Sequence, residues 1–148
     1  NADAKDLIDR YFERYPRIND YMANTIAFAK KNGYVETMLG RRRYIPDIGS
    51  SNRNVRMFAE RTAINAPIQG SAADMIKLAM ISLHNEIRRR GLQSSMILQV
   101  HDELVFDTRR SELEEIRDLV VDIMKSAMNL RVPIEVDTGW GNNWLEAH

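Results

Sequence analysis

Two short hydrophobic segments separated by three polar residues impose the tightest constraint on how this chain can fold. Met96–Val100 and Leu104–Phe106 are rich in aliphatic and aromatic side chains, and His101-Asp102-Glu103 lies between them. Runs of this length and composition are typical of β-strands, and the polar residues occupy the natural turn position of an antiparallel hairpin. Most other apolar residues recur at helical spacing, so the sequence predicts an α+β fold: a helical first half, then an antiparallel hairpin with flanking helices.

Helical spacing begins near the start of the chain and continues on both sides of a proline. Apolar residues recur from Leu7 to Tyr15 and again from Ile18 to Ala29. Pro16 lacks an N–H group and suits the first turn of a helix, while Gly33 suits a left-handed cap at a helix end. The sequence therefore predicts two consecutive helices, the second ending near Gly33.

Turn, cap and breaker residues order the remaining elements. The sequence predicts a hairpin of Tyr34–Thr37 and Arg42–Ile45 turning at Gly40, a loop over 46–52, and a helix from about Asn54 that Pro67 interrupts. Further along, it predicts a helix opened by a capping box at Ser71–Asp74 and ended by Arg88–Gly91, a helix capped at Ser111–Glu114, and a strand over Ile134–Thr138.

Length and composition exclude several classes of protein. The chain has 148 residues, of which 44% are hydrophobic, enough for a buried core and too many for a disordered chain. Because there are no cysteines, a disulfide framework and a thiol nucleophile are excluded, and three histidines leave little room for a histidine-rich metal site. There is neither an apolar run of 18 residues nor a signal peptide, so we expect a soluble protein of the cytoplasm.

The charges balance overall but separate along the chain. Residues 30–61 contain eight basic and three acidic side chains, whereas residues 101–148 contain five basic and eleven acidic ones. A basic segment followed by an acidic one can form a phosphate-binding surface beside a cation-binding surface. The alternative is two solvated faces that attract each other.

The acidic turn is the most informative local feature. Asp102 and Glu103 are adjacent, and two close carboxylates repel each other unless a cation lies between them. A magnesium ion would relieve the repulsion and could polarise a phosphoryl group. The alternative is a solvated acidic turn with His101 as a bystander.

Two basic segments are candidates for nucleic-acid binding. Arg61, Asn65 and Gln69 are spaced by four residues and therefore share one side of a helix. A guanidinium binds phosphate, and the two amides can hydrogen-bond the minor-groove acceptors that all base pairs present. The second segment, Arg41-Arg42-Arg43, could bind a nucleic-acid backbone. An ordinary polar helix face and a generic polyanion patch remain the alternatives.

Taken in order, these segments resemble signatures of the family A DNA polymerases, the bacterial DNA polymerase I group. The resemblance is carried by Gly33–Asp47, by Arg61–Asp74 and by Gln99–Phe106, and it extends along the chain to Trp144–His148. It implies an enzyme of DNA replication and repair that joins a primer 3′-hydroxyl to the α-phosphate of a deoxynucleoside triphosphate with two magnesium ions.

The resemblance also implies roles for single residues. Asp102 matches the metal-binding aspartate of the third polymerase motif, Glu103 the accessory carboxylate, and His101 the residue that contacts the primer terminus. Arg61, Asn65 and Gln69 match the residues that contact the template backbone and the minor groove of newly formed pairs. Arg41, Arg42 and Arg43 belong to the basic stretch that flanks the template.

In this family the other metal-binding aspartate and the triphosphate-binding fingers helix precede the matched segments. We therefore expect residues 1–60 to be the last part of the fingers and residues 61–148 part of the palm, without polymerase activity on their own. Expected partners are primer–template DNA, deoxynucleoside triphosphates and, through uncovered faces, further copies of the chain. Bacterial cytoplasm and the nucleoid are the expected location. A non-catalytic module that binds primer–template DNA is the alternative function.

Overall fold

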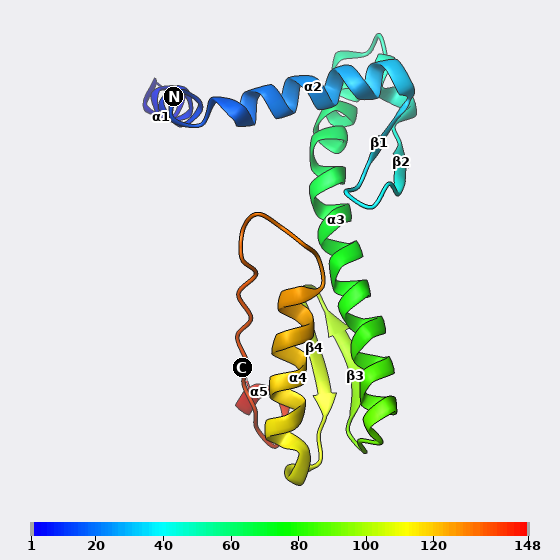
Figure 1. The fold of residues 1–148 in the computed structure, drawn as a ribbon. Coiled ribbons are helices and arrows are strands. Elements are labelled where there is room, and N and C mark those ends of the chain that lie inside the picture. Colours follow the sequence, from blue (N-terminus) through cyan, green and yellow to red (C-terminus); the bar gives the residue numbers. More distant parts are fainter. Residues whose placement is uncertain (1, 148) are drawn as a thin grey trace. The chain divides into compact units, whose positions relative to one another are not determined.

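The structure, a computed structural model, describes residues 2–147 and has the α+β architecture that the sequence predicts (Figure 1). The chain divides between Ala72 and Ala73 into two compact units, which we call the N-terminal unit and the C-terminal unit. Within the described residues, each unit contains a two-stranded antiparallel sheet together with helices. None of the described helices has both the length and the apolar content needed to cross a membrane.

The first two helices follow their sequence signals. Helix α1 spans Ala2–Arg14 and α2 spans Pro16–Asn32, with Pro16 in the first turn. Gly33 has a φ of 78° and donates its N–H to the Ala29 carbonyl at 2.8 Å, which closes the helix end. A left-handed residue without a Cβ at this position is the usual helix stop, and the predicted pair of helices is confirmed.

A short hairpin packs on α2 in the N-terminal unit (Figure 1). Strands β1 (Tyr34–Glu36) and β2 (Arg42–Tyr44) pair in antiparallel register, and the turn contains Gly40, as predicted. The 3₁₀ helix η1 (Pro46–Gly49) follows within the predicted loop. The core of this unit joins side chains from α2, the hairpin, η1 and α3: Ala29, Val35, Ile45, Ile48, Ala59 and Ala63.

The long helix α3 corrects the predicted break at Pro67. It runs as one helix over Arg53–Arg90, with Pro67 inside it, so the expectation of two helices was wrong. Nearby side chains bond the backbone around the proline: Tyr21 donates its hydroxyl to the Ile64 carbonyl at 2.8 Å, and Ser71 donates its own to the Pro67 carbonyl at 2.6 Å. Ser71 is therefore a helix-interior residue and not the cap of a new helix.

The C-terminal unit is built around the predicted hydrophobic hairpin. Strand β3 covers Ser95–Val100 and β4 covers Glu103–Asp107, with a register shift between Met96 and Leu98. The 3₁₀ helix η2 (Arg110–Glu112) and α4 (Leu113–Ser126) follow the hairpin, and Figure 1 shows α4 beside it. The core combines α3 and α4 through Leu83, Ile87, Ile116, Leu119 and Val120, with Leu104 and Phe106 of β4 against it.

Glu112 has a different role from the predicted helix cap. No side chain caps α4, and the Glu112 carboxylate instead accepts N–H bonds from Gln93 at 3.0 Å and Ser94 at 2.9 Å. The buried Ser94 donates its hydroxyl to Glu112 at 2.6 Å and accepts the Arg109 N–H at 3.1 Å. The predicted capping box at Ser111–Glu114 was wrong, because this carboxylate ties the turn after α3 to the segment before α4.

Because of this network, the free energy of unfolding of the chain should decrease at acidic pH. The Ser94 hydroxyl bond, with the backbone N–H bonds from Gln93 and Ser94, lowers the pKa of Glu112 below its usual value of 4.5. A lowered native pKa stabilises the fold above pH 4.5, and that stabilisation is lost as the pH falls through the native pKa. Glu112→Gln should therefore lower the melting temperature at pH 7 by a few degrees, and by less at pH 3.

Thermal melts of wild-type and Glu112→Gln proteins at both pH values measure this difference. Glu13→Gln, which changes an exposed glutamate of α1, serves as the control and should shift the melting temperature little at either pH. If the difference in melting temperature between wild type and Glu112→Gln stays constant from pH 7 to pH 3, the ionised Glu112 carboxylate does not stabilise the fold.

The final segment lacks the predicted strand. Residues 134–138 form no strand, and only the short helix α5 (Trp144–Ala147) follows α4 in the described chain. Strands need a neighbour to complete their ladder of hydrogen bonds. Since β3 and β4 pair only with each other among the described residues, the alternation over Ile134–Thr138 has no ladder to join.

Candidate functional site

The acidic residues lie at the tip of the β3–β4 hairpin. Val100 pairs with Glu103, which leaves His101 and Asp102 as a two-residue turn. The structure thus corrects the expected three-residue turn, because Glu103 is the first residue of β4. Asp102 is exposed and Glu103 is partly exposed, so both carboxylates are accessible from solvent at one tip.

His101 has an unusual backbone conformation for a histidine. Its φ is 53°, in the left-handed region that two-residue hairpins usually fill with glycine or asparagine. The side-chain amide of Gln99 donates to the His101 carbonyl and holds the turn from within. A side-chain-bearing residue kept in this conformation is typical of functional sites, where the side chain itself is needed.

The turn carboxylates can supply part of a magnesium site. Carboxylate oxygens are the donors that magnesium prefers, and the ion takes about six oxygen ligands, several of them water. Among the described residues, no group of three or more histidine, aspartate or glutamate side chains could hold a metal ion. Asp102 and Glu103 therefore fit as two ligands of a site whose other ligands come from elsewhere.

The polar row of α3 lies in one groove of the N-terminal unit. Arg61, Asn65 and Gln69 all line it, as their spacing predicts, and the groove has a volume of about 440 Å³. Arg41 and Arg43 line it from the hairpin. The structure thus brings two separately predicted basic segments to one surface, while the roles of the side chains stay predictions.

A close contact fixes the hairpin against α3. Arg41 donates from Nη2 to the Gly70 carbonyl at 3.1 Å, and the Met38 N–H donates to the Ser71 hydroxyl at 2.9 Å. A Cβ on Gly70 would lie 2.6 Å from Cγ2 of Thr37, a distance that real Cβ atoms do not tolerate. Gly70 is therefore needed for close approach, a requirement that the sequence pattern does not reveal.

The three consecutive arginines separate into different environments. Arg42 donates from Nε to Glu36 at 2.9 Å and lies over the Tyr34 ring at 4.4 Å, and the Glu36 hydrogen bond raises its pKa. Arg41 is bound to the Gly70 carbonyl, whereas Arg43 makes no ion pair with any described residue. Of the three, Arg43 is thus the best placed to meet a phosphate in the groove.

Sequence reasoning missed Phe58 as a groove residue. The Phe58 side chain is 66% exposed and lines the groove. The signal was present, because Phe58 precedes Arg61 by three residues and so continues the row that Arg61 and Asn65 define.

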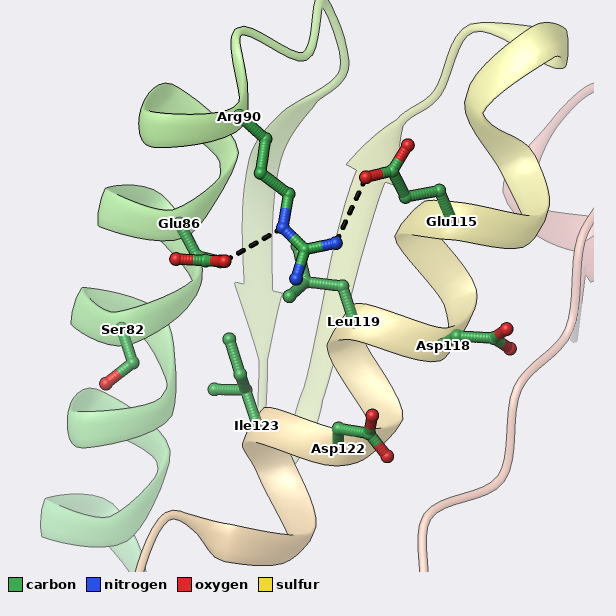
Figure 2. Close-up of a pocket in the computed structure, with 8 residues that line it drawn as sticks. All are labelled: Ser82, Glu86, Arg90, Glu115, Asp118, Leu119, Asp122 and Ile123. Atoms are coloured by element: carbon green, nitrogen blue, oxygen red, sulfur yellow. Dashed lines mark hydrogen bonds and ion pairs between the residues drawn. The ribbon is translucent and has the colours of Figure 1, made fainter.

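A second hollow, of about 550 Å³, lies between α3 and α4 in the C-terminal unit (Figure 2). Most of its charged lining is acidic; it is lined by Ser82, Glu86, Arg90, Glu115, Asp118, Leu119, Asp122 and Ile123. None of the residues predicted for a functional site lies in it.

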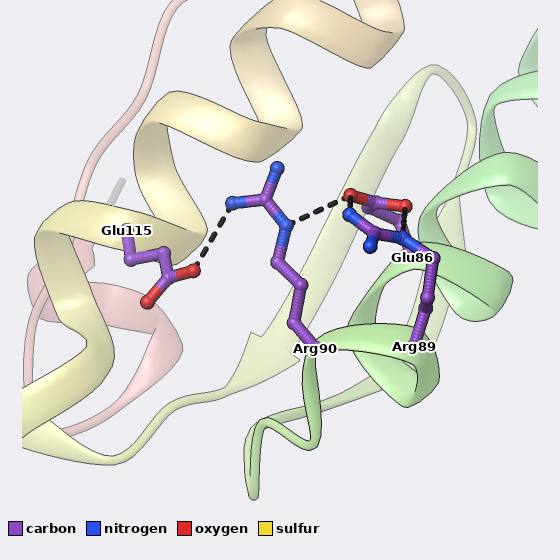
Figure 3. A network of polar contacts seen from close by, with 4 residues as sticks. All are labelled: Glu86, Arg89, Arg90 and Glu115. Carbon is purple, nitrogen blue, oxygen red and sulfur yellow. Dashed lines mark hydrogen bonds and ion pairs between the residues drawn. The ribbon is translucent and has the colours of Figure 1, made fainter.

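Ion pairs at this second hollow connect the two helices (Figure 3). Arg90 donates from Nε to Glu86 at 2.8 Å and from Nη1 to Glu115 at 3.0 Å. Hydrogen bonds from Arg89 and then Arg90 lower the pKa of Glu86 to about 2. Because these side chains remain accessible to solvent, the network adds little stability.

Comparison with known proteins identifies what the chain resembles. The family model for DNA polymerase family A matches residues 1–146. DNA polymerase I of Lactococcus lactis is 54% identical over 145 residues, covering 98% of this chain and 16% of that protein. The corresponding protein of Geobacillus stearothermophilus is 51% identical over 145 residues, covering 98% of this chain and 17% of that protein.

A solved structure shows the same fold. The chain is similar to the POL domain of Pol1 from M. smegmatis in complex with DNA primer-template and dNTP, with a TM-score of 0.95 and 49% sequence identity. The similarity covers 99% of this chain and 26% of that one. The chain thus spans about one sixth of the length of the curated relatives named above.

Proposed function

This chain belongs to DNA polymerase family A, and from that premise we propose that it forms part of a DNA-directed DNA polymerase that extends primer 3′-ends with deoxynucleotides. Similarity along nearly the whole chain to a polymerase domain bound to primer-template and dNTP is the observation that carries the proposal. We assign primer–template DNA and deoxynucleoside triphosphates as the ligands of the complete protein, in the bacterial cytoplasm at the nucleoid.

In this proposal the hairpin tip serves the chemistry. Asp102 and Glu103 hold magnesium, which supplies charge neutralisation at the phosphates when bound. Because Asp102 is exposed in the turn, its carboxylate can share a metal ion with ligands from other segments. His101, held next to it by the turn, contacts the primer terminus.

The groove serves DNA binding. Arg61 and the hairpin cations Arg41 and Arg43 attract phosphate oxygens, and Arg42 supports the hairpin through Glu36. Asn65 and Gln69 both donate and accept hydrogen bonds, so they can recognise the minor-groove acceptors that are common to all base pairs. This recognition suits an enzyme that must accept every template sequence.

We assign residues 1–60 to the fingers and residues 61–148 to the palm. The boundary between the two compact units falls slightly later in the sequence, between Ala72 and Ala73, and lies inside α3. Exposed apolar side chains on α1, such as Leu7 and Ile8, are the surfaces through which isolated copies would self-associate.

Complementation between two pieces tests the function. The isolated chain should not extend a primer, because two carboxylates at one tip are too few for a two-metal site. Mixing it with a second polypeptide that supplies the rest of the polymerase domain should restore magnesium-dependent primer extension. The proposal fails if the chain extends primers alone, or if the two pieces associate without extending any.

A non-catalytic DNA-binding module is the second candidate function. It is favoured by the groove, where cations and amides gather without a cluster of carboxylates. Duplex binding by the chain, weakened by Arg61→Ala and falling steeply with salt, combined with no extension by the two pieces together, would favour this second function.

A further inference from the structure

An exposed aromatic ring lies beside the cations of the α3 groove. Phe58 is 66% exposed, and it lines the groove together with Arg43 and Arg61. Aromatic side chains beside a positively charged groove are the usual means of binding single-stranded nucleic acid, because every base can stack on a ring.

The cations next to this ring are available to a polyanion. Neither Arg43 nor Arg61 forms an ion pair with a described residue, and the groove's carboxylate, Glu36, is bound to Arg42. Arg41 also lines the groove and donates to the Gly70 carbonyl. The groove therefore has an excess of positive charge around Phe58.

Position along α3 separates the ring from the amides. Phe58 precedes Asn65 by seven residues, which is about 10 Å along a helix that rises about 1.5 Å per residue. Successive nucleotides of one strand rise about 3.4 Å, so this separation corresponds to about three nucleotides. A strand that runs along α3 would therefore have about three nucleotides between the amides and the ring.

We propose that Phe58 is a stacking platform for an unpaired template base next to the primer–template duplex. This inference rests on the proposed DNA-binding role of the groove and deepens it by naming the single-stranded template as a further ligand. Arg43 and Arg61 hold the phosphates of the strand while the phenyl ring stacks on a base, without preference for its identity.

Fluorescence anisotropy with the 148-residue chain tests the proposal. The probes are a blunt DNA duplex and the same duplex with a single-stranded 5′ template extension. Phe58→Ala should weaken binding of the extended duplex about fivefold or more and leave blunt-duplex binding unchanged. Phe58→Trp should retain or strengthen the preference for the extended duplex.

Matched variants distinguish a failure of the stacking role of Phe58 from a failure of the groove's DNA-binding role. Ile68→Ala removes another exposed apolar side chain of α3, 60% exposed and outside the groove lining, and should leave both affinities unchanged. Equal weakening of both probes by Phe58→Ala, or no weakening of either, overturns the stacking role. If wild type binds neither probe, or if Arg61→Ala leaves blunt-duplex binding intact, the groove's DNA-binding role itself fails.

Discussion

Asp102→Ala should lower magnesium-dependent primer extension by the full-length polymerase roughly 1000-fold or more. The reason is the position of Asp102 in a two-residue turn, where Glu103 is the neighbouring carboxylate and no cluster of other ligands lies nearby among the described residues. Without Asp102, the tip keeps one carboxylate, which cannot hold the metal against the phosphates. Single-turnover extension of a labelled primer measures the effect.

Matched substitutions make this prediction specific. Asp102→Asn keeps the shape of the side chain and removes its charge, so it should lose nearly as much activity as Asp102→Ala. Asp107→Ala changes an exposed aspartate at the other end of β4 and should leave the rate within about twofold. DNA affinity should not fall with Asp102→Ala, since a negative charge is removed. Retention of more than a tenth of the rate would contradict the metal role.

The elements that were correctly predicted carry local signals. Pro16 and Gly33 bound α2 through their own backbone geometry, and the β3–β4 hairpin follows from adjacent strand-like runs. Arg61, Asn65 and Gln69 share a groove because spacing alone places them on one side of a helix. For these features, residues near in sequence determine the structure, so a pattern is sufficient.

The failed predictions depend on contacts distant in sequence. Pro67 lies inside α3, and Tyr21, far from it in sequence, donates to the Ile64 carbonyl of the turn before it. The Glu112 carboxylate accepts a hydrogen bond from Ser94 instead of capping its own helix. The alternation over 134–138 lacks a neighbouring strand among the described residues, which the segment's own sequence cannot reveal. Tertiary partners override local preference at each of these positions.

Gly70→Ala should lower the stability of the chain and its affinity for duplex DNA, because the added Cβ forces the hairpin away from α3. Alanine in a helix interior normally adds about 1 kcal/mol of stability over glycine. Here the added Cβ would meet Thr37 Cγ2 at 2.6 Å, and overpacking of this kind costs about 1–3 kcal/mol. We therefore expect a net loss of stability, together with roughly tenfold weaker duplex binding as Arg41 and Arg43 move from Arg61.

Thr37→Ser provides the decisive partner substitution, because it removes Cγ2 and keeps the hydroxyl that accepts the Arg41 N–H at 3.2 Å. In the Thr37→Ser background the clash is absent, so Gly70→Ala should stabilise the chain and leave duplex binding intact. Denaturant unfolding of the four proteins should give a coupling free energy of about 1–3 kcal/mol between the two positions. The same effect of Gly70→Ala in both backgrounds would mean that the contact with Thr37 does not explain the glycine. A change of sign would instead show that this contact holds the basic hairpin on the face of α3 that we propose binds DNA.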